Sequence, residues 1–181
     1  MSEDDNIARV LDGTAVAADI REGLRARIEA FFVVFGRTPK LGILLAGDDP
    51  GSALYVRNKV RTSEELGMTT TLERLPETAS LDEAMSIVGR FNGDPSVDGI
   101  LVQSPLPSGM GSDAEQKIFD AIDVEKDVDG FHPTNVGRLV QARAPFSSCT
   151  PSGVIELLSL IHISEPTRRT PISYAVVCVK K

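Results

Sequence analysis

Apolar residues along this chain follow two kinds of pattern, helical spacing and short unbroken runs. In the first periodic segment they recur at every fourth position, at Val16, Ile20, Leu24 and Ile28. This spacing predicts an amphipathic helix over residues 14–32. An unbroken apolar run follows at residues 41–46 and predicts a buried strand, which ends in a loop at residues 47–51.

The alternation of helix and strand patterns continues to residue 158. Two further strands are predicted, at residues 68–75 and 97–103. Further helices are predicted to begin at Ser52, Ser80, Ser112 and Pro151. Ser80 and Ser112 each precede a glutamate by three residues, which is the pattern of a capping box. The predicted fold class is therefore α/β, a three-layer domain with a mostly parallel sheet flanked by helices.

Length and composition are those of an ordinary globular domain. The chain has 181 residues, 41% of them hydrophobic and 25% charged, and no apolar run approaches the roughly 20 residues of a membrane span. Its first residues are acidic and it has only two cysteines, Cys149 and Cys178, so we expect a cytoplasmic protein with no membrane partner. A net charge of -7, without Trp or a basic patch, argues against nucleic acid as a partner.

Charge divides the chain near residue 158. Residues 158–181 carry four bases and one acid, whereas residues 1–157 carry 15 bases and 25 acids. The segment 158–168 resembles the frame translation of a sequencing adapter, and residues 172–181 resemble a flow-cell primer. We therefore expect one domain over residues 1–157 and a non-native tail of adapter read-through over residues 158–181. The alternative is a native basic strand at the C-terminus.

Ser52, Tyr55 and Lys59 form the first candidate site. In open α/β sheets ligands bind outside the carboxyl ends of the strands, and the helix with these residues follows such an end. At 100° per residue the three side chains fall within about 60° of one helical face. A phenol and an ammonium on one face could stack a flat ring and deliver a proton. The alternative is a solvated polar face.

Polar residues after the strand at 97–103 form two more candidates. Gln103 ends this apolar strand, where its amide could hydrogen-bond a ligand, hold a lysine, or only mark the end of the strand. Asp127 and Asp129 would lie on one side of an extended segment, which suits paired hydrogen bonding or a metal; the alternative is a tight solvated turn. His132 is expected to be a structural turn residue rather than a base.

The segment Gly109-Met-Gly-Ser-Asp-Ala114 matches a dinucleotide-binding pattern. Pro105 and Pro107 separate it from the preceding strand, and Ser112 is better explained as a helix cap. We therefore predict no cofactor-binding residues in this chain, and no metal site among the candidate residues.

Four motifs in order carry a resemblance to a known family. They are Gly51-Ser-Ala-Leu-Tyr-Val-Arg-Asn-Lys59, Asp98-Gly-Ile-Leu-Val-Gln-Ser-Pro-Leu-Pro107, Lys126-Asp-Val-Asp-Gly-Phe-His-Pro-Thr-Asn-Val-Gly-Arg-Leu139 and Cys149-Thr-Pro-Ser-Gly153. Together they resemble the bifunctional methylenetetrahydrofolate dehydrogenase/methenyltetrahydrofolate cyclohydrolase (FolD) family, over about residues 8–158. This region corresponds to the N-terminal catalytic domain of the family, which makes residues 1–157 a folate-binding catalytic domain.

The resemblance implies a role for each candidate residue. Tyr55 would stack on the folate ring system and Lys59 would transfer the proton in the cyclohydrolase step. Gln103 would hydrogen-bond Lys59, Asp129 would anchor the pterin, and Ser52 would support the region of the lysine. The catalytic set is thus Lys59, Tyr55 and Gln103, and the substrate-binding set is Tyr55, Ser52, Gln103 and Asp129.

The resemblance also implies an activity, a cofactor and an assembly. The family oxidises 5,10-methylenetetrahydrofolate with NADP and hydrolyses the methenyl product to 10-formyltetrahydrofolate, as a cytoplasmic homodimer of one-carbon metabolism. Its NADP-binding Rossmann domain should follow residue 158, where the expected tail stands. Two alternatives stay open: an inactive folate-binding fragment, and a relative of the amino-acid or shikimate dehydrogenases, which lacks this set of residues.

Overall fold

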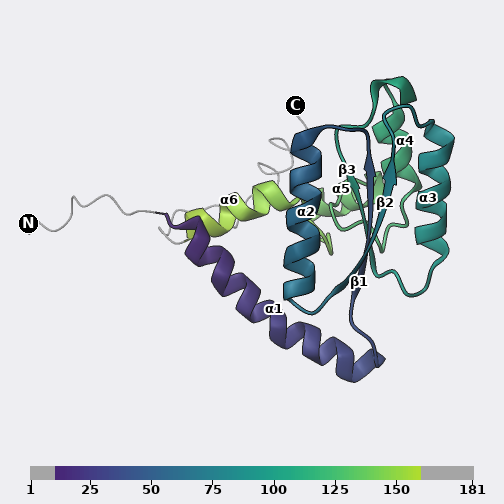
Figure 1. Cartoon of the computed structure of the whole chain (residues 1–181). Coiled ribbons are helices and arrows are strands. Elements are labelled where there is room, and N and C mark those ends of the chain that lie inside the picture. The colour runs from purple at the N-terminus through teal and green to yellow at the C-terminus, as the bar shows by residue number, and fades with distance from the viewer. Residues whose placement is uncertain (1–10, 160–181) are drawn as a thin grey trace, which may run out of the picture.

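A computed structural model describes residues 11–159 of the chain (Figure 1). In this part of the chain, helices and strands alternate as the apolar pattern predicts up to Gln103, and helices alone follow. In order they are α1 (Gly13–Phe35), β1 (Lys40–Ala46), α2 (Pro50–Glu65), β2 (Thr69–Leu75), α3 (Leu81–Gly93), β3 (Gly99–Gln103), the 3-10 turn η2 (Ser108–Met110), α4 (Ala114–Ala121), α5 (Pro133–Val140) and α6 (Cys149–Ser159).

The three strands form a parallel sheet in the order β2-β1-β3. Helix α2 covers one face of the sheet, and α3 and α4 cover the other (Figure 1). This is the predicted three-layer α/β architecture. Because all three strands run in one direction, their carboxyl ends meet at one edge, where an open sheet of this kind binds ligands.

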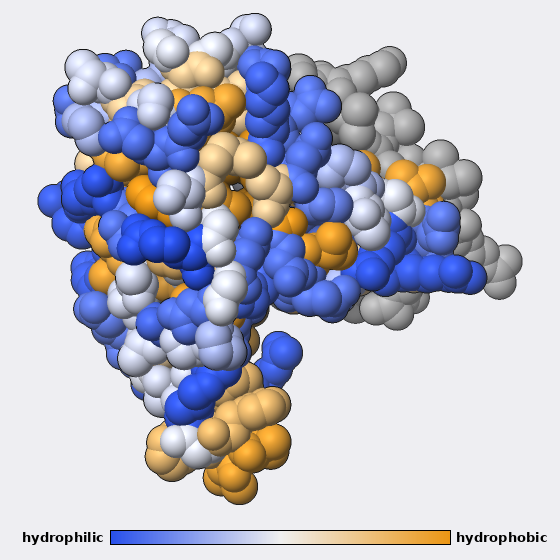
Figure 2. All heavy atoms as spheres, turned by 90° about the vertical axis from the view of Figure 1, so that its right-hand side faces the viewer, coloured by the Kyte–Doolittle hydropathy of each residue, from blue (hydrophilic) through white to orange (hydrophobic). Residues whose placement is uncertain are grey.

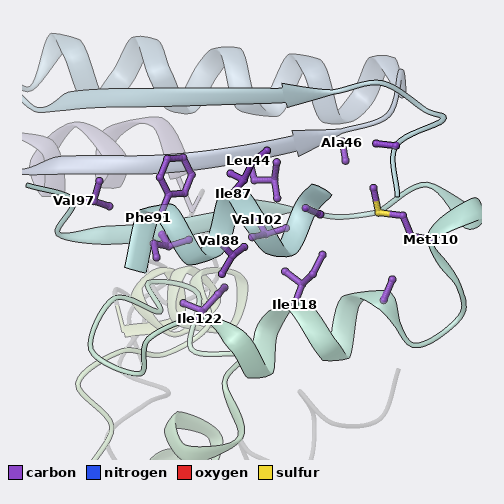
Figure 3. Close-up of a cluster of buried hydrophobic side chains, with 14 residues drawn as sticks. Leu44, Ala46, Ile87, Val88, Phe91, Val97, Val102, Met110, Ile118 and Ile122 are labelled. Atoms are coloured by element: carbon purple, nitrogen blue, oxygen red, sulfur yellow. The ribbon is translucent and has the colours of Figure 1, made fainter. Parts of the chain in front are cut away.

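The central strand β1 is buried on both faces. Its residues alternate between two apolar clusters, because successive side chains of a strand point to opposite faces. Leu44 and Ala46 join the larger cluster beneath α3 and α4 (Figure 3), and Ile43 and Leu45 join the smaller cluster beneath α2. Burial on both faces explains why this strand reads as an unbroken apolar run rather than as an alternating one.

The capping box predicted at Ser80 is confirmed. The Ser80 hydroxyl accepts a hydrogen bond from the backbone N–H of Glu83 at 3.3 Å, and the Glu83 carboxylate accepts one from the backbone N–H of Ser80 at 2.7 Å. Two orphan donors at the start of α3 are thereby satisfied.

The second capping box, at Ser112, is wrong. The chain turns at Gly111, whose φ of 102° favours glycine, and α4 begins only after Asp113. Glu115 therefore lies in the first turn of the helix, and its Oε1 accepts a hydrogen bond from the backbone N–H of Leu106 at 3.3 Å instead of reaching back to Ser112.

Helix α5 has no counterpart among the predicted elements. His132, expected to be a structural turn residue, caps this helix: its Nδ1 accepts a hydrogen bond from the backbone N–H of Thr134 at 3.1 Å. The structural role of His132 is therefore confirmed, although the turn opens a helix. The sequence does contain one signal for the start of this helix, Pro133 at the first helical position.

Helix α1 stands away from the sheet and has no buried residue (Figure 1). Its last turn exposes Phe32, Val33, Val34 and Phe35, and apolar atoms gather at this lower end of the molecule in Figure 2. None of the helices between residues 11 and 159 is long and apolar enough to cross a membrane. Residues 160–181, most of the expected tail, lie outside the described part of the chain.

Candidate functional site

The start of α2 is fixed close to the carboxyl end of β1. Asp49 caps the helix, and its Oδ2 accepts a hydrogen bond from the backbone N–H of Ser52 at 2.6 Å. The pKa of Asp49 is lowered mainly by this bond. In the preceding loop Gly47 has a φ of 92°, and a Cβ there would lie 2.7 Å from a carboxylate oxygen of Glu77. Few residues other than glycine would allow the chain to enter α2 at this point.

Ser52, Tyr55 and Lys59 differ in exposure along this helix. Ser52 is buried, and its hydroxyl donates to the backbone carbonyl of Ser104 at 3.4 Å. Tyr55 is 64% exposed and Lys59 is half-buried. The helix thus presents a phenol and an ammonium to the outside, while the serine joins α2 to the end of β3.

Gln103, the last residue of β3, contacts the lysine directly. Its Oε1 accepts a hydrogen bond from Lys59 Nζ at 3.2 Å, and its Nε2 donates to the Ser104 carbonyl at 2.6 Å. Because a carbonyl oxygen can only accept, the Ser104 contact fixes the NH₂ end of the amide. The oxygen end of Gln103 is thereby turned toward Lys59.

Asp129 approaches the same place from the loop between α4 and α5. Burial raises the pKa of Asp129 above its ordinary value of 3.8. The positive charge of Lys59 acts in the opposite direction and lowers this pKa, and the negative charge of Asp127 raises it. Asp129 is therefore a half-buried carboxyl between a cation and a second carboxyl.

One cavity of about 400 Å³ brings these groups together. This volume falls within the range of sites for small ligands, about 300–1,000 Å³. Of the predicted site residues, four line the cavity: Tyr55, Lys59, Gln103 and Asp129. Ser52 does not line it but lies behind the wall that these residues form.

The cavity has further lining residues to which the sequence assigned no role. Phe131 follows the Asp129 loop, and Ser148, Cys149 and Thr150 lie at the start of α6. The motif Cys149-Thr-Pro-Ser-Gly153 contributes to the family resemblance, and this could have marked the start of α6 as part of the site. Phe131 lies in the motif at residues 126–139, which carries the same resemblance, but its place in the cavity depends on how the loop folds.

Asp127 is not paired with Asp129 in the cavity. Asp127 forms an isolated parallel bridge with Ile100, and residues 128–129 that follow it form a turn rather than an extended strand. Asp127 is 1% exposed and accepts hydrogen bonds from the backbone N–H groups of Phe131 and His132, so the solvated turn considered as the alternative is wrong as well. Among the described residues, no group of three or more His, Cys, Asp or Glu side chains is arranged to hold a metal ion.

The dinucleotide-like segment does not fit a phosphate. Part of it forms η2, and α4 then begins behind the Asp113 carboxylate at its N-cap. Residues 104–107 separate this segment from β3, so it lacks the direct strand-to-helix turn that holds a dinucleotide phosphate. The residues present here do not suit NADP, and no step of the chemistry proposed below passes through it.

Comparison with known proteins identifies the family of this chain. The family model for the tetrahydrofolate dehydrogenase/cyclohydrolase catalytic domain matches residues 11–129. The bifunctional protein FolD of Staphylococcus aureus is 46% identical over 152 residues, which are 84% of this chain and 52% of that protein. The chain therefore spans about half the length of the curated relatives that it matches.

Solved structures give the same result. The bifunctional FolD methylenetetrahydrofolate dehydrogenase/cyclohydrolase of Campylobacter jejuni is 39% identical with a TM-score of 0.78, over 86% of this chain and 54% of that one. The methylenetetrahydrofolate dehydrogenase-cyclohydrolase of Trypanosoma brucei, solved with NADP cofactor and an inhibitor, is 31% identical with a TM-score of 0.80, over 87% of this chain and 53% of that one. These matches exclude the alternative relationship to amino-acid or shikimate dehydrogenases. The chain belongs to the tetrahydrofolate dehydrogenase/cyclohydrolase family.

Proposed function

We propose that this chain binds tetrahydrofolate derivatives in the cavity between α2, β3 and the Asp129 loop, and that it hydrolyses 5,10-methenyltetrahydrofolate to 10-formyltetrahydrofolate. One observation carries the proposal: Lys59 Nζ is held by Gln103 Oε1 at 3.2 Å in a cavity that Tyr55 and Asp129 also line. A proton-transfer group, a ring platform and an anchoring carboxyl thus converge on one space large enough for a flat ring system.

Each residue has a part in this proposal. Tyr55, which is largely exposed, stacks on the pterin, and the Asp129 carboxyl accepts hydrogen bonds from the ring. Lys59 is the catalytic residue for proton transfer, and Gln103 holds its ammonium at the wall of the cavity. Ser52 supports the site from behind, through the Ser104 carbonyl that also binds Gln103.

The hydrolysis itself requires water and the movement of protons. The oxygen of water bonds to the cationic methenyl carbon and loses a proton. The bond from this carbon to one ring nitrogen then breaks and that nitrogen takes up a proton, while the hydroxyl left on the carbon loses its proton and becomes the formyl oxygen. The net reaction consumes one water molecule and releases one proton. Lys59 is placed to carry a proton between the attacking oxygen and the ring nitrogen.

For the full-length protein we propose both activities of the family. It would oxidise 5,10-methylenetetrahydrofolate with NADP, and hydrolyse the product, as a cytoplasmic homodimer of one-carbon metabolism. The names of the relatives, and the NADP in the Trypanosoma brucei structure, support this proposal. The second candidate is a chain that binds folate without catalysis, because the matched relatives are about twice as long.

The division at residue 158 is a proposal as well. Residues 1–157 would form the folate-binding catalytic domain, and residues 158–181 would be a non-native tail. The reversal of charge and the adapter-like segment support it. Sequencing codons 155–181 from freshly isolated genomic DNA tests this division, and an identical basic segment there would overturn it.

The experiment for the function uses the 181-residue chain. Calorimetric titration with tetrahydrofolate is expected to give saturable binding, and 5,10-methenyltetrahydrofolate is expected to be hydrolysed faster than in buffer alone. Binding without hydrolysis would favour the inactive folate-binding candidate. A folded chain that shows neither would contradict the proposal.

A further inference from the structure

Asp127 is a buried carboxylate that the proposed hydrolysis does not use. It is 1% exposed, and three N–H groups point at it. Its Oδ1 accepts from the backbone of Phe131 at 3.2 Å, and its Oδ2 accepts from the backbone of His132 and from Asn135 Nδ2, both at 2.9 Å. Burying a carboxylate is costly unless it is paired or hydrogen-bonded in this way. A buried carboxylate at residue 127 therefore needs a structural or functional explanation.

All three donors to Asp127 come after Asp129 in the chain. The chain leaves Asp127, passes through residues 128–130, and returns to the same carboxylate with the N–H groups of residues 131 and 132. Gly130 makes the return possible with a φ of 69°. Asp129 therefore stands at the tip of a loop that is closed around the Asp127 carboxylate.

Asn135 fixes this closed loop to the rest of the domain. It is fully buried, and its Nδ2 donates both to Asp127 and to the backbone carbonyl of Val124 at 2.9 Å. On the other side, the backbone of Ile100 in β3 donates to the carbonyl of Lys126 at 2.7 Å. The base of the loop is thus held by both α5 and the central sheet.

We propose that Asp127 is a positioning residue for folate binding: its carboxylate closes the loop that carries Asp129, so that the Asp129 carboxyl faces Lys59 across the cavity. This inference rests on the proposed function for its substrate. It adds a residue that never touches the ligand but determines where the anchoring carboxyl lies.

The charge of Asp127 gives this role a distinct signature. Its negative charge raises the pKa of Asp129, while the positive charge of Lys59 lowers it. Tyr55 and Cys149 line the same cavity, and His132 follows directly in the loop. Removing the charge of Asp127, or letting the loop open to water, changes the pKa of Asp129 in the same direction, downward.

The first test is Asp127→Asn, which keeps the size of the side chain and removes its charge. Lys59 is held by α2 and β3 rather than by this loop, so the variant is expected to raise the KM for 5,10-methenyltetrahydrofolate by roughly tenfold with little change in kcat. NMR titration of ¹³C-labelled aspartate in the unliganded chain is expected to show a lower pKa for Asp129. Asp98→Asn, at the far end of β3, is the matched control and should change neither value.

A second variant covers the case in which the first does not fold. If Asp127→Asn does not fold, Asn135→Ala takes its place, because it removes one of the three donors and leaves the charge; its KM is expected to rise by roughly threefold. A folded variant of either kind with an unchanged KM and an unchanged pKa of Asp129 would overturn the positioning role. If the wild-type chain neither binds nor hydrolyses folates, the proposed function fails. The titration of Asp129 in Asn135→Ala, which keeps the charge of Asp127, still decides the inference: a lowered pKa supports it and an unchanged pKa overturns it.

Discussion

Lys59 and Asp129 occupy one cavity but have opposite requirements for their surroundings. The ammonium is held by a neutral amide oxygen, whereas the carboxyl is partly removed from water and its pKa rises. A group whose folded pKa is raised favours the folded state while it is protonated, and costs stability once pH rises above the unfolded value. Ionisation of Asp129 therefore does not stabilise the fold, and under the proposed function the ionised carboxylate would serve the ligand.

Asp129→Asn separates these two contributions. Near pH 7 its free energy of unfolding is expected to equal or exceed that of the wild type, because a penalty on burying charge is removed. Its affinity for tetrahydrofolate is expected to fall by roughly tenfold, because a hydrogen bond to a charged group is lost. Urea unfolding and calorimetric titration measure the two effects. Unchanged affinity would leave Asp129 as a residue of the turn only.

At the level of elements, the apolar pattern predicted most of the fold for a physical reason. A strand buried on both faces must be an unbroken apolar run, as in β1. In a helix that packs on one side, apolar residues must recur every three to four positions. The same logic put Lys59 on α2 and Gln103 at the end of β3, two elements that a parallel sheet brings together at its carboxyl edge.

The elements and contacts that sequence reasoning missed depend on tertiary structure. The capping box at Ser112 failed because the turn at Gly111 delays the helix, and its glutamate bonds to the backbone of Leu106 instead. Helix α5 is short, and its buried Asn135 donates a hydrogen bond to Asp127. No local periodicity in the sequence reveals this contact between loop and helix. For the same reason Asp127 could not be distinguished from Asp129 by spacing alone.

One ion pair, between Arg37 and Asp98, lies at the start of the sheet. It should make the stability of the protein depend on pH. Arg37 donates to both carboxylate oxygens of Asp98, at 2.6 and 2.8 Å, and the backbone N–H of Lys40 donates to the same group. The hydrogen bond from Arg37 is the main cause that lowers the pKa of Asp98 below its ordinary value of 3.8. A lowered folded pKa contributes stability above the unfolded value, and this contribution is lost as pH falls through the folded value.

Asp98→Asn is therefore expected to lower the free energy of unfolding by about 1 kcal/mol at pH 7, a modest loss because the pair is partly exposed to solvent. The difference between wild type and variant should shrink as pH falls below the ordinary value of Asp98. Urea unfolding of both proteins at several pH values between 7 and 3 checks this. A difference that stays constant over that range would show that the ion pair does not contribute through its charge.

At the level of the whole molecule, the cavity for which we propose folate binding is separate from the glycine pattern at residues 109–114. Residues 104–107 separate this pattern from β3, so it lacks the direct strand-to-helix turn of a dinucleotide site. The matched relatives are about twice as long as the aligned region. Folate binding and NADP binding are therefore expected to separate in experiments on this chain.

The 181-residue chain is expected to show no saturable binding of NADP and no oxidation of 5,10-methylenetetrahydrofolate. Hydride transfer needs the nicotinamide held against the bridging carbon, and positioning is the main contribution of the protein to that step. Fluorescence titration with NADPH, alongside the formation of NADPH from NADP, checks both. Saturable binding would mean that residues outside 11–159 supply a cofactor site.

The central claim is that Lys59 transfers the proton in the hydrolysis of the methenyl bridge. The most direct measurement is the rate of 5,10-methenyltetrahydrofolate hydrolysis by Lys59→Met, corrected for the spontaneous reaction. The control is Lys117→Met, which removes an exposed lysine of α4 that pairs with Asp113 on the surface. We expect Lys59→Met to keep its fold and to lose nearly all of the catalysed rate, while the control keeps its rate. A folded Lys59→Met that retains more than about a tenth of the wild-type rate, a loss of less than roughly 1.4 kcal/mol in barrier height, would contradict the assignment.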